Sequence, residues 1–87
     1  MAEPAPPPAA DPRGLIREAY RIEGISAAEC RSIFLDWALG LPGDVTDAAR
    51  ALHTVYAPHF PDHPMTGLLA EAAVPAPAAR RGGRRRR

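Results

Sequence analysis

Apolar residues recur at a helical period in four segments between Asp11 and Val74, and no segment shows the alternation that a strand requires. In the first segment, residues 11–24, Asp11 is placed to cap a helix and Pro12 to begin it, because the missing N–H of proline costs nothing in the first turn. Gly24 is expected to end this helix. Its apolar residues are Leu15, Ile16, Ala19, Tyr20 and Ile22.

The second segment, residues 26–41, begins with a capping box, since Ser26 is followed three residues later by Glu29. A helix that is apolar over most of its circumference is typically contacted on more than one side. The pattern therefore predicts a central helix with Phe34 and Trp37 in the core. The apolar stripe contains Ala27, Cys30, Ile33, Phe34, Trp37, Ala38 and Leu41, and Leu35 and Leu39 lie well round the helix from it.

Two shorter helices are expected after the chain turns through LGLPGD, residues 39–44. Asp44 is placed to cap the first of them, which Pro58 closes, and Asp62 or His63 to cap the second. Their apolar stripes are Val45, Ala48, Ala49, Leu52, Val55 and Tyr56 in the first, and Met65, Leu68, Leu69 and Ala72 in the second. The whole pattern predicts an all-α fold, a small single domain of three to four short helices.

The two ends of the chain have too few large apolar residues to join a core. Residues 1–10 are mostly Pro and Ala, and residues 75–87 read PAPAARRGGRRRR, so both are expected to be disordered tails around a compact helical domain at residues 11–74. Residues 1–79 hold all ten Asp and Glu with five Arg, whereas residues 80–87 hold six Arg. The near-neutral total therefore hides an acidic domain and a basic tail.

The candidate chemistry argues against an enzyme. A chain of 87 residues has room for one small domain and not for a large catalytic cleft. His53, His59 and His63 lie close in sequence, but a Pro-broken connector separates them and their spacing does not match a zinc site. Cys30 is expected to be a small buried residue, because a reactive thiol needs exposure and a basic neighbour. We therefore expect no enzymatic activity, no metal and no cofactor.

No sequence feature indicates secretion or a membrane. The chain has a single Cys and no leader with a charged start and an apolar run. No apolar segment approaches the roughly 20 residues needed to span a bilayer. A soluble cytoplasmic protein without a membrane partner is the expectation.

Two hypotheses for function remain open. The first is a small helical protein-protein interaction module or accessory subunit, because four of its large apolar residues are expected to exceed what a domain of some 60 residues can bury. The candidate protein-binding residues are Leu35, Leu39, Phe60 and Met65. The alternative is that the fourth helix covers them.

The second hypothesis is a nucleic-acid-binding or ribosome-associated protein that uses its C-terminal tail. Six guanidinium groups can neutralise phosphates and release counterions, although the tail has no aromatic side chains to stack on bases. The candidate residues are Arg80, Arg81, Arg84, Arg85, Arg86 and Arg87. A solvated tail, a docking segment for an acidic protein and a clamp on the acidic face of the domain itself are the competing interpretations.

Overall fold

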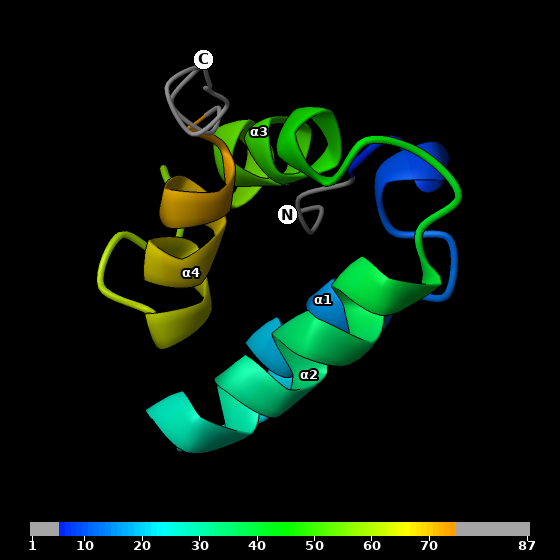
Figure 1. Cartoon of the computed structure of the whole chain (residues 1–87). Coiled ribbons are helices and arrows are strands. Elements are labelled where there is room, and N and C mark those ends of the chain that lie inside the picture. The colour runs from blue at the N-terminus through cyan, green and yellow to red at the C-terminus, as the bar shows by residue number, and fades with distance from the viewer. Residues whose placement is uncertain (1–5, 75–87) are drawn as a thin grey trace, which may run out of the picture.

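The computed structural model describes residues 6–74, which form a short 3-10 turn followed by four α-helices (Figure 1). The elements are η1 (Pro8–Ala10), α1 (Leu15–Arg21), α2 (Ala27–Gly40), α3 (Val45–Tyr56) and α4 (Pro64–Ala72). No strand occurs in this part of the chain, and the predicted all-α fold of short helices is confirmed.

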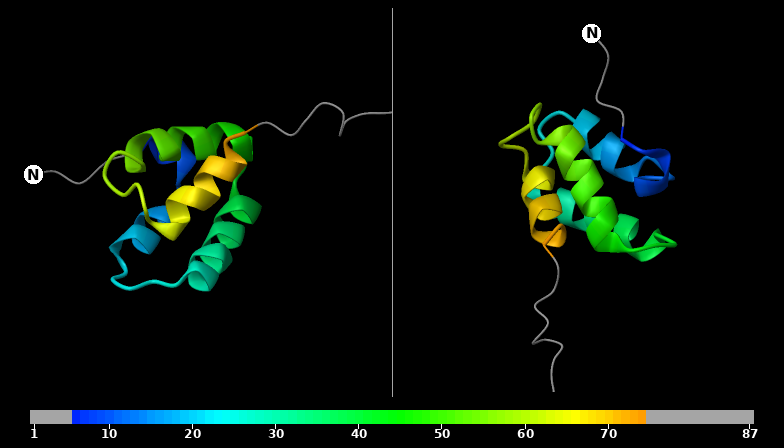
Figure 2. Two further views of the ribbon diagram at one scale, coloured as in Figure 1. Left: turned by 90° about the vertical axis from the view of Figure 1, so that its left-hand side faces the viewer. Right: turned by 90° about the horizontal axis from the view of Figure 1, so that it is seen from above.

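Helix α4 lies between α2 and α3 (Figures 1 and 2). It contacts α1, α2 and α3, whereas α2 packs against α1 and α4, and η1 packs against α3. The sequence predicts α2 as the central helix, but α4 has that position. The neighbours of α2 cover one side of it, so Leu35 and Leu39 on another side remain exposed.

The core draws side chains from η1 and from all four α-helices. Trp37 is 2% exposed, which confirms its predicted place, and the half-buried Phe34 packs beside it with the ring centroids 5.5 Å apart. Burying such aromatic side chains supplies much of the apolar stabilisation available to a small domain. The buried apolar residues are Ala10, Ile16, Ala19, Tyr20, Cys30, Trp37, Ala49, Leu52, Tyr56, Met65 and Leu69.

The predicted caps of α2 and α3 are confirmed. The Ser26 hydroxyl accepts from the Glu29 N–H at 3.1 Å, and the Ser26 N–H donates to the Glu29 carboxylate at 2.9 Å. The backbone hydrogen bond from Ser26 lowers the pKa of Glu29. At the start of α3, the Asp44 Oδ1 accepts from the Thr46 N–H at 2.7 Å. Local hydrogen bonds of this kind satisfy N–H groups that the first helical turn leaves without partners.

The start of α1 differs from the prediction. The helix begins at Leu15, because Gly14 adopts the left-handed conformation with φ of +69° and breaks the helical path after Pro12. Asp11 is buried in the turn, and its carboxylate accepts the N–H groups of Ile16 at 3.3 Å and Arg17 at 3.0 Å. Asp11 therefore does stabilise the start of α1, but across a turn and not as the residue next to the helix.

The ordered domain also extends further towards the N-terminus than the expected start at Asp11. Residues 8–10 form η1, and Ala10 is 5% exposed within the core. The Trp37 indole N–H donates to the Ala10 carbonyl at 2.7 Å. A buried indole needs an acceptor, and this one comes from the segment expected to be a disordered leader.

An aromatic cluster joins α1, the end of α3 and the α3–α4 connection. The rings of Tyr20 and Tyr56 stack with centroids 4.2 Å apart, and Phe60 lies 5.0 Å from Tyr20. The Thr66 hydroxyl donates to the Phe60 carbonyl at 2.8 Å, so the Tyr20 hydroxyl, 2.6 Å from Thr66, must donate to the Thr66 oxygen. Burial raises the pKa of Tyr20 to about 12, in agreement with a hydroxyl that keeps its proton.

His63 caps α4 through its neutral ring. Its Nδ1 accepts the Met65 N–H at 3.0 Å, so the expectation of a cap at Asp62 or His63 is confirmed for His63. The ring is half-buried, with its centroid 4.4 Å from that of Tyr20. Burial disfavours the imidazolium and lowers the pKa of His63. A proton on Nδ1 would also remove the acceptor of the cap.

We expect the protein to lose stability as the pH falls from 7 to 5. A lowered pKa in the folded state means that the unfolded chain binds the proton more readily. The contribution of His63 is therefore complete above the ordinary histidine pKa of about 6.5 and is lost below it. The loss should approach the cost of a missing N-cap, about 0.5–2 kcal/mol. The measurement is the thermal midpoint as a function of pH.

Two variants assign this pH dependence to a residue. His63→Asn keeps a side-chain acceptor for the cap but does not titrate, so its thermal midpoint should change less with pH than that of the wild type. The matched variant His59→Asn, in the exposed connection before α4, should keep the wild-type dependence. An unchanged pH dependence in His63→Asn would show that another group is responsible.

Candidate functional site

The side chains considered for chemistry do not gather in the structure. Within residues 6–74, no group of three or more His, Cys, Asp or Glu is arranged to hold a metal ion. Cys30 is fully buried, and burial raises the pKa of its thiol, so the thiolate that would act as a nucleophile is disfavoured. In the same part of the chain, no helix has the length and apolar character to cross a membrane.

The four candidate protein-binding residues do not form one surface. Met65 is fully buried at the start of α4, so its place in the predicted surface is wrong. The turn at residues 57–63 brings α4 back onto α2 and α1, which points Met65 into the core. Phe60 is half-buried in the aromatic cluster with Tyr20 and Tyr56. Met65 is thus buried by the packing of α4, and Phe60 is partly buried by the aromatic cluster. Neither of these elements covers Leu35 or Leu39.

Leu35 and Leu39 remain exposed on α2. Leu35 is 53% exposed and Leu39 is 85% exposed, although Cys30 and Trp37 on the same helix are buried. Residues four apart lie one above the other on a helix, so the two side chains form one continuous apolar strip. We call this strip the leucine face. Two exposed charged residues are close to the leucine face: Arg31 lies one turn before Leu35, and Asp36 follows Leu35 directly.

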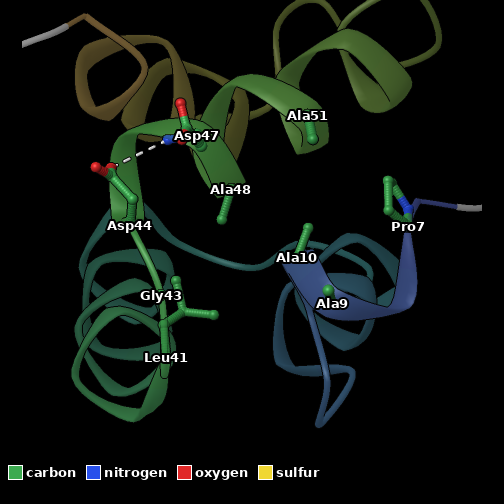
Figure 3. Close-up of a pocket in the computed structure, with 9 residues that line it drawn as sticks. All are labelled: Pro7, Ala9, Ala10, Leu41, Gly43, Asp44, Asp47, Ala48 and Ala51. Carbon is green, nitrogen blue, oxygen red and sulfur yellow. Dashed lines mark hydrogen bonds between the residues drawn. The ribbon is translucent and has the colours of Figure 1, made fainter.

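A second surface feature is a pocket of about 300 Å³ between η1 and the start of α3 (Figure 3). Ala10 of η1 and Ala48 of α3 project towards each other across it, whereas the carboxylates of Asp44 and Asp47, two further lining residues, point away from it. We call this pocket the η1–α3 groove. Its lining residues are Pro7, Ala9, Ala10, Leu41, Gly43, Asp44, Asp47, Ala48 and Ala51.

Two acidic residues at the start of α3, Asp44 and Asp47, contribute to the lining of the η1–α3 groove. Asp44 uses Oδ1 for both of its cap bonds, to the N–H groups of Thr46 and Asp47, and its Oδ2 takes part in neither. The Asp47 Oδ1 lies 3.5 Å from the Arg50 Nη1, in an exposed ion pair. Such pairs contribute little stability, because water screens both charges.

The η1–α3 groove could not be predicted from the sequence pattern. Three segments form it: η1, the α2–α3 connection and the first two turns of α3. One of these segments belongs to the stretch expected to be a disordered leader. The only trace in the sequence is the small size of Ala9, Ala10, Ala48 and Ala51, and small residues fit ordinary close packing equally well.

The predicted nucleic-acid-binding residues, Arg80, Arg81, Arg84, Arg85, Arg86 and Arg87, lie outside the described residues, and so does half of the expected leader, residues 1–5. The described residues carry nine Asp and Glu against five Arg, a formal charge of −4 with neutral His. The domain is therefore acidic, as the segregation of charge predicts.

Comparison of the chain with protein-family models, with curated proteins and with solved structures finds no match. Residues 6–74 form a small all-α domain with an exposed leucine face on α2 and a groove between η1 and α3.

Proposed function

We propose that this protein is a small helical interaction module, an adaptor or accessory subunit, that binds another protein through the leucine face of α2. The observation that carries the proposal is the exposure of Leu39, at 85%, with Leu35 one turn before it at 53%. Single exposed apolar residues are common on protein surfaces, but two leucines in register on one helix form a strip that a partner can cover.

The fold does not need these two side chains. The core is built from residues on the other side of α2 and on its neighbours, and its centre includes the fully buried Ile16, Leu52 and Leu69. Covering an exposed leucine is worth about 1.5–3 kcal/mol. The leucine face can therefore supply binding energy at little cost to folding.

A helical strip of this kind fits a helix of the partner. Side chains spaced four apart form a ridge that packs into the groove of a facing helix. Two leucines are a small fraction of a specific interface, which usually buries about 1,200–2,000 Å² in total. The exposed Arg31 and Asp36 are placed to form the polar rim around the apolar centre.

Site-specific cross-linking tests this proposal in the full-length chain. A photoreactive residue at Leu39 in cells of the source organism should yield a defined cross-linked protein, whereas one at the exposed Asp62 should not. We expect Leu35→Asp to reduce the Leu39 cross-link at least tenfold without changing the thermal midpoint by more than a few degrees.

Ala27→Asp is the matched control, because it adds the same charge to an exposed position in the first turn of the same helix, more than two turns before Leu35. It should leave the Leu39 cross-link in place. The proposal fails if Leu35→Asp leaves the cross-linked product unchanged, or if Leu39 and Asp62 give the same products. A large loss of stability in Leu35→Asp would instead assign Leu35 to the core.

A further inference from the structure

We propose that the leucine face of α2 pairs with the leucine face of a second copy of this chain, with the two helices parallel about a two-fold axis. This pairing rests on the proposed function and names the partner of that surface. A two-fold pair uses the same patch on both chains, so the patch has to be complementary to itself. The exposed side of α2 meets this condition in the spacing of its residues and in the positions of its charges.

Two small residues lie in line with the two leucines on α2. Ala28 and Ser32 are both exposed, and each precedes one of the leucines by seven residues. Positions 28, 32, 35 and 39 therefore alternate between spacings of four and three residues, the repeat that keeps one side of a helix against another helix. One exposed strip thus runs along α2, with small side chains in its N-terminal half and the two leucines in its C-terminal half.

Two opposite charges flank this strip. At about 100° per residue, Arg31 lies about 70° to one side of the centre of the strip and Asp36 about 70° to the other. Both residues are exposed, and neither side chain makes a hydrogen bond or an ion pair within residues 6–74. Arg13 donates to the Asp36 carbonyl at 3.4 Å, so this contact leaves the Asp36 carboxylate for another chain.

The two charges favour a parallel pair. A parallel two-fold arrangement brings opposite edges of the two strips together, so Arg31 faces the partner's Asp36, and the symmetry repeats this ion pair on the other side. An antiparallel arrangement brings like edges together, which places Asp36 near the partner's Glu29 and Arg31 near the partner's Arg31. Like charges at close range oppose association. The arrangement that satisfies both charges is therefore a parallel pair of identical helices.

The paired surface is small, so the dimer should be reversible. Across the two-fold axis each leucine packs against its own copy, and the small Ala28 and Ser32 let the helices approach closely. Helix α2 has 14 residues, which is only two heptads, and stable interfaces usually bury about 1,200–2,000 Å². We therefore expect a monomer–dimer equilibrium that depends on protein concentration.

Sedimentation equilibrium of the full-length protein tests the pairing. The wild type should change from monomer to dimer between micromolar and millimolar concentrations. Leu35→Asp and Leu39→Asp should each raise the dissociation constant of the dimer at least tenfold, because each places a carboxylate next to its own copy. Ala27→Asp adds the same charge outside the strip and should change the dissociation constant less than twofold.

Exchange of the two flanking charges tests the ion pairs. Arg31→Asp alone puts two carboxylates together on each side of the dimer and should raise the dissociation constant at least threefold. The double variant Arg31→Asp with Asp36→Arg restores opposite charges across a parallel pair. Its dissociation constant should return to within twofold of the wild-type value.

A cysteine at residue 32 tests the parallel orientation. In a parallel two-fold pair each residue of the strip lies beside its own copy, so Ser32→Cys should form a disulfide between chains when oxidised glutathione is added. The native Cys30 is fully buried and should not react. Asp62→Cys, at an exposed position outside α2, is the matched control and should form the disulfide at least fivefold more slowly.

Three results would overturn the pairing. They are a wild type that stays monomeric up to millimolar concentration, a double charge variant that dimerises no better than Arg31→Asp, and equal rates of disulfide formation at residues 32 and 62. The photo-cross-link at Leu39 separates this proposal from the proposed function. A product with twice the mass of this chain is the expected result. A product that contains a different protein, from a chain that stays monomeric, would overturn the pairing and leave the proposed function in place.

Discussion

Replacement of Trp37 by alanine is expected to leave the protein largely unfolded at room temperature. The indole is 2% exposed and donates to the Ala10 carbonyl at 2.7 Å, so the substitution creates a cavity and also leaves a buried carbonyl without its donor. Removing a large buried aromatic side chain costs about 3–5 kcal/mol. A domain of this size has a total stability of only about 5 kcal/mol. Circular dichroism during thermal and urea unfolding measures the loss.

Trp37→Phe separates the two contributions. It keeps most of the ring volume but removes the N–H, so the Ala10 carbonyl loses its partner at an expected cost of about 1–3 kcal/mol. Amide exchange in residues 9–11 should then speed up more than exchange in α3, if this hydrogen bond holds η1 on the core. A cooperative melt of Trp37→Ala close to that of the wild type would show that Trp37 lies on the surface.

Replacement of Met65 by aspartate is expected to abolish folding. Met65 is fully buried at the first turn of α4, the helix that contacts the other three α-helices. A carboxylate there must either lose its hydration without a partner or bind a proton, and the cost exceeds about 4 kcal/mol. The expected result is loss of the cooperative thermal transition.

Leu39→Asp is the matched comparison for Met65→Asp. Both substitutions exchange a large apolar side chain for the same carboxylate, but Leu39 is 85% exposed and its replacement should change stability by less than about 0.5 kcal/mol. Similar destabilisation by the two substitutions would contradict the separation of these residues into core and surface. A folded Met65→Asp variant would return Met65 to the candidate binding surface.

The helices of this protein could be predicted because their starting signals are local. The capping box at Ser26 and Glu29, the cap at Asp44 and the cap at His63 each involve residues within three positions of one another. Apolar periodicity likewise placed Leu52, Leu69 and Trp37 in the core, because one face of each short helix has to be buried.

The start of α1 and the role of η1 depended on longer connections. Asp11 reaches over a turn to the N–H groups of Ile16 and Arg17. The positive φ of Gly14 places this turn before the helix, and the sequence signal of Asp11 followed by Pro12 does not indicate it. Ala10 accepts a hydrogen bond from Trp37, 27 residues away. The composition of residues 1–10 shows only that this segment has little to bury by itself, so it could not indicate a contact with a distant helix.

The sequence by itself determined the helical class, the approximate positions of four helices, the caps at Ser26 and Asp44, a choice of two residues for the cap of α4, and the acidic character of the domain. Each of these follows from residue type or from neighbours within a helical turn. Tertiary structure alone decided that α4 is central, that Met65 is buried while Leu39 is exposed, and that η1 and α3 enclose a groove. Apolar spacing shows which face of a helix prefers burial. Which of these faces is covered depends on how the helices pack, because a domain this small has too few helices to cover every apolar face.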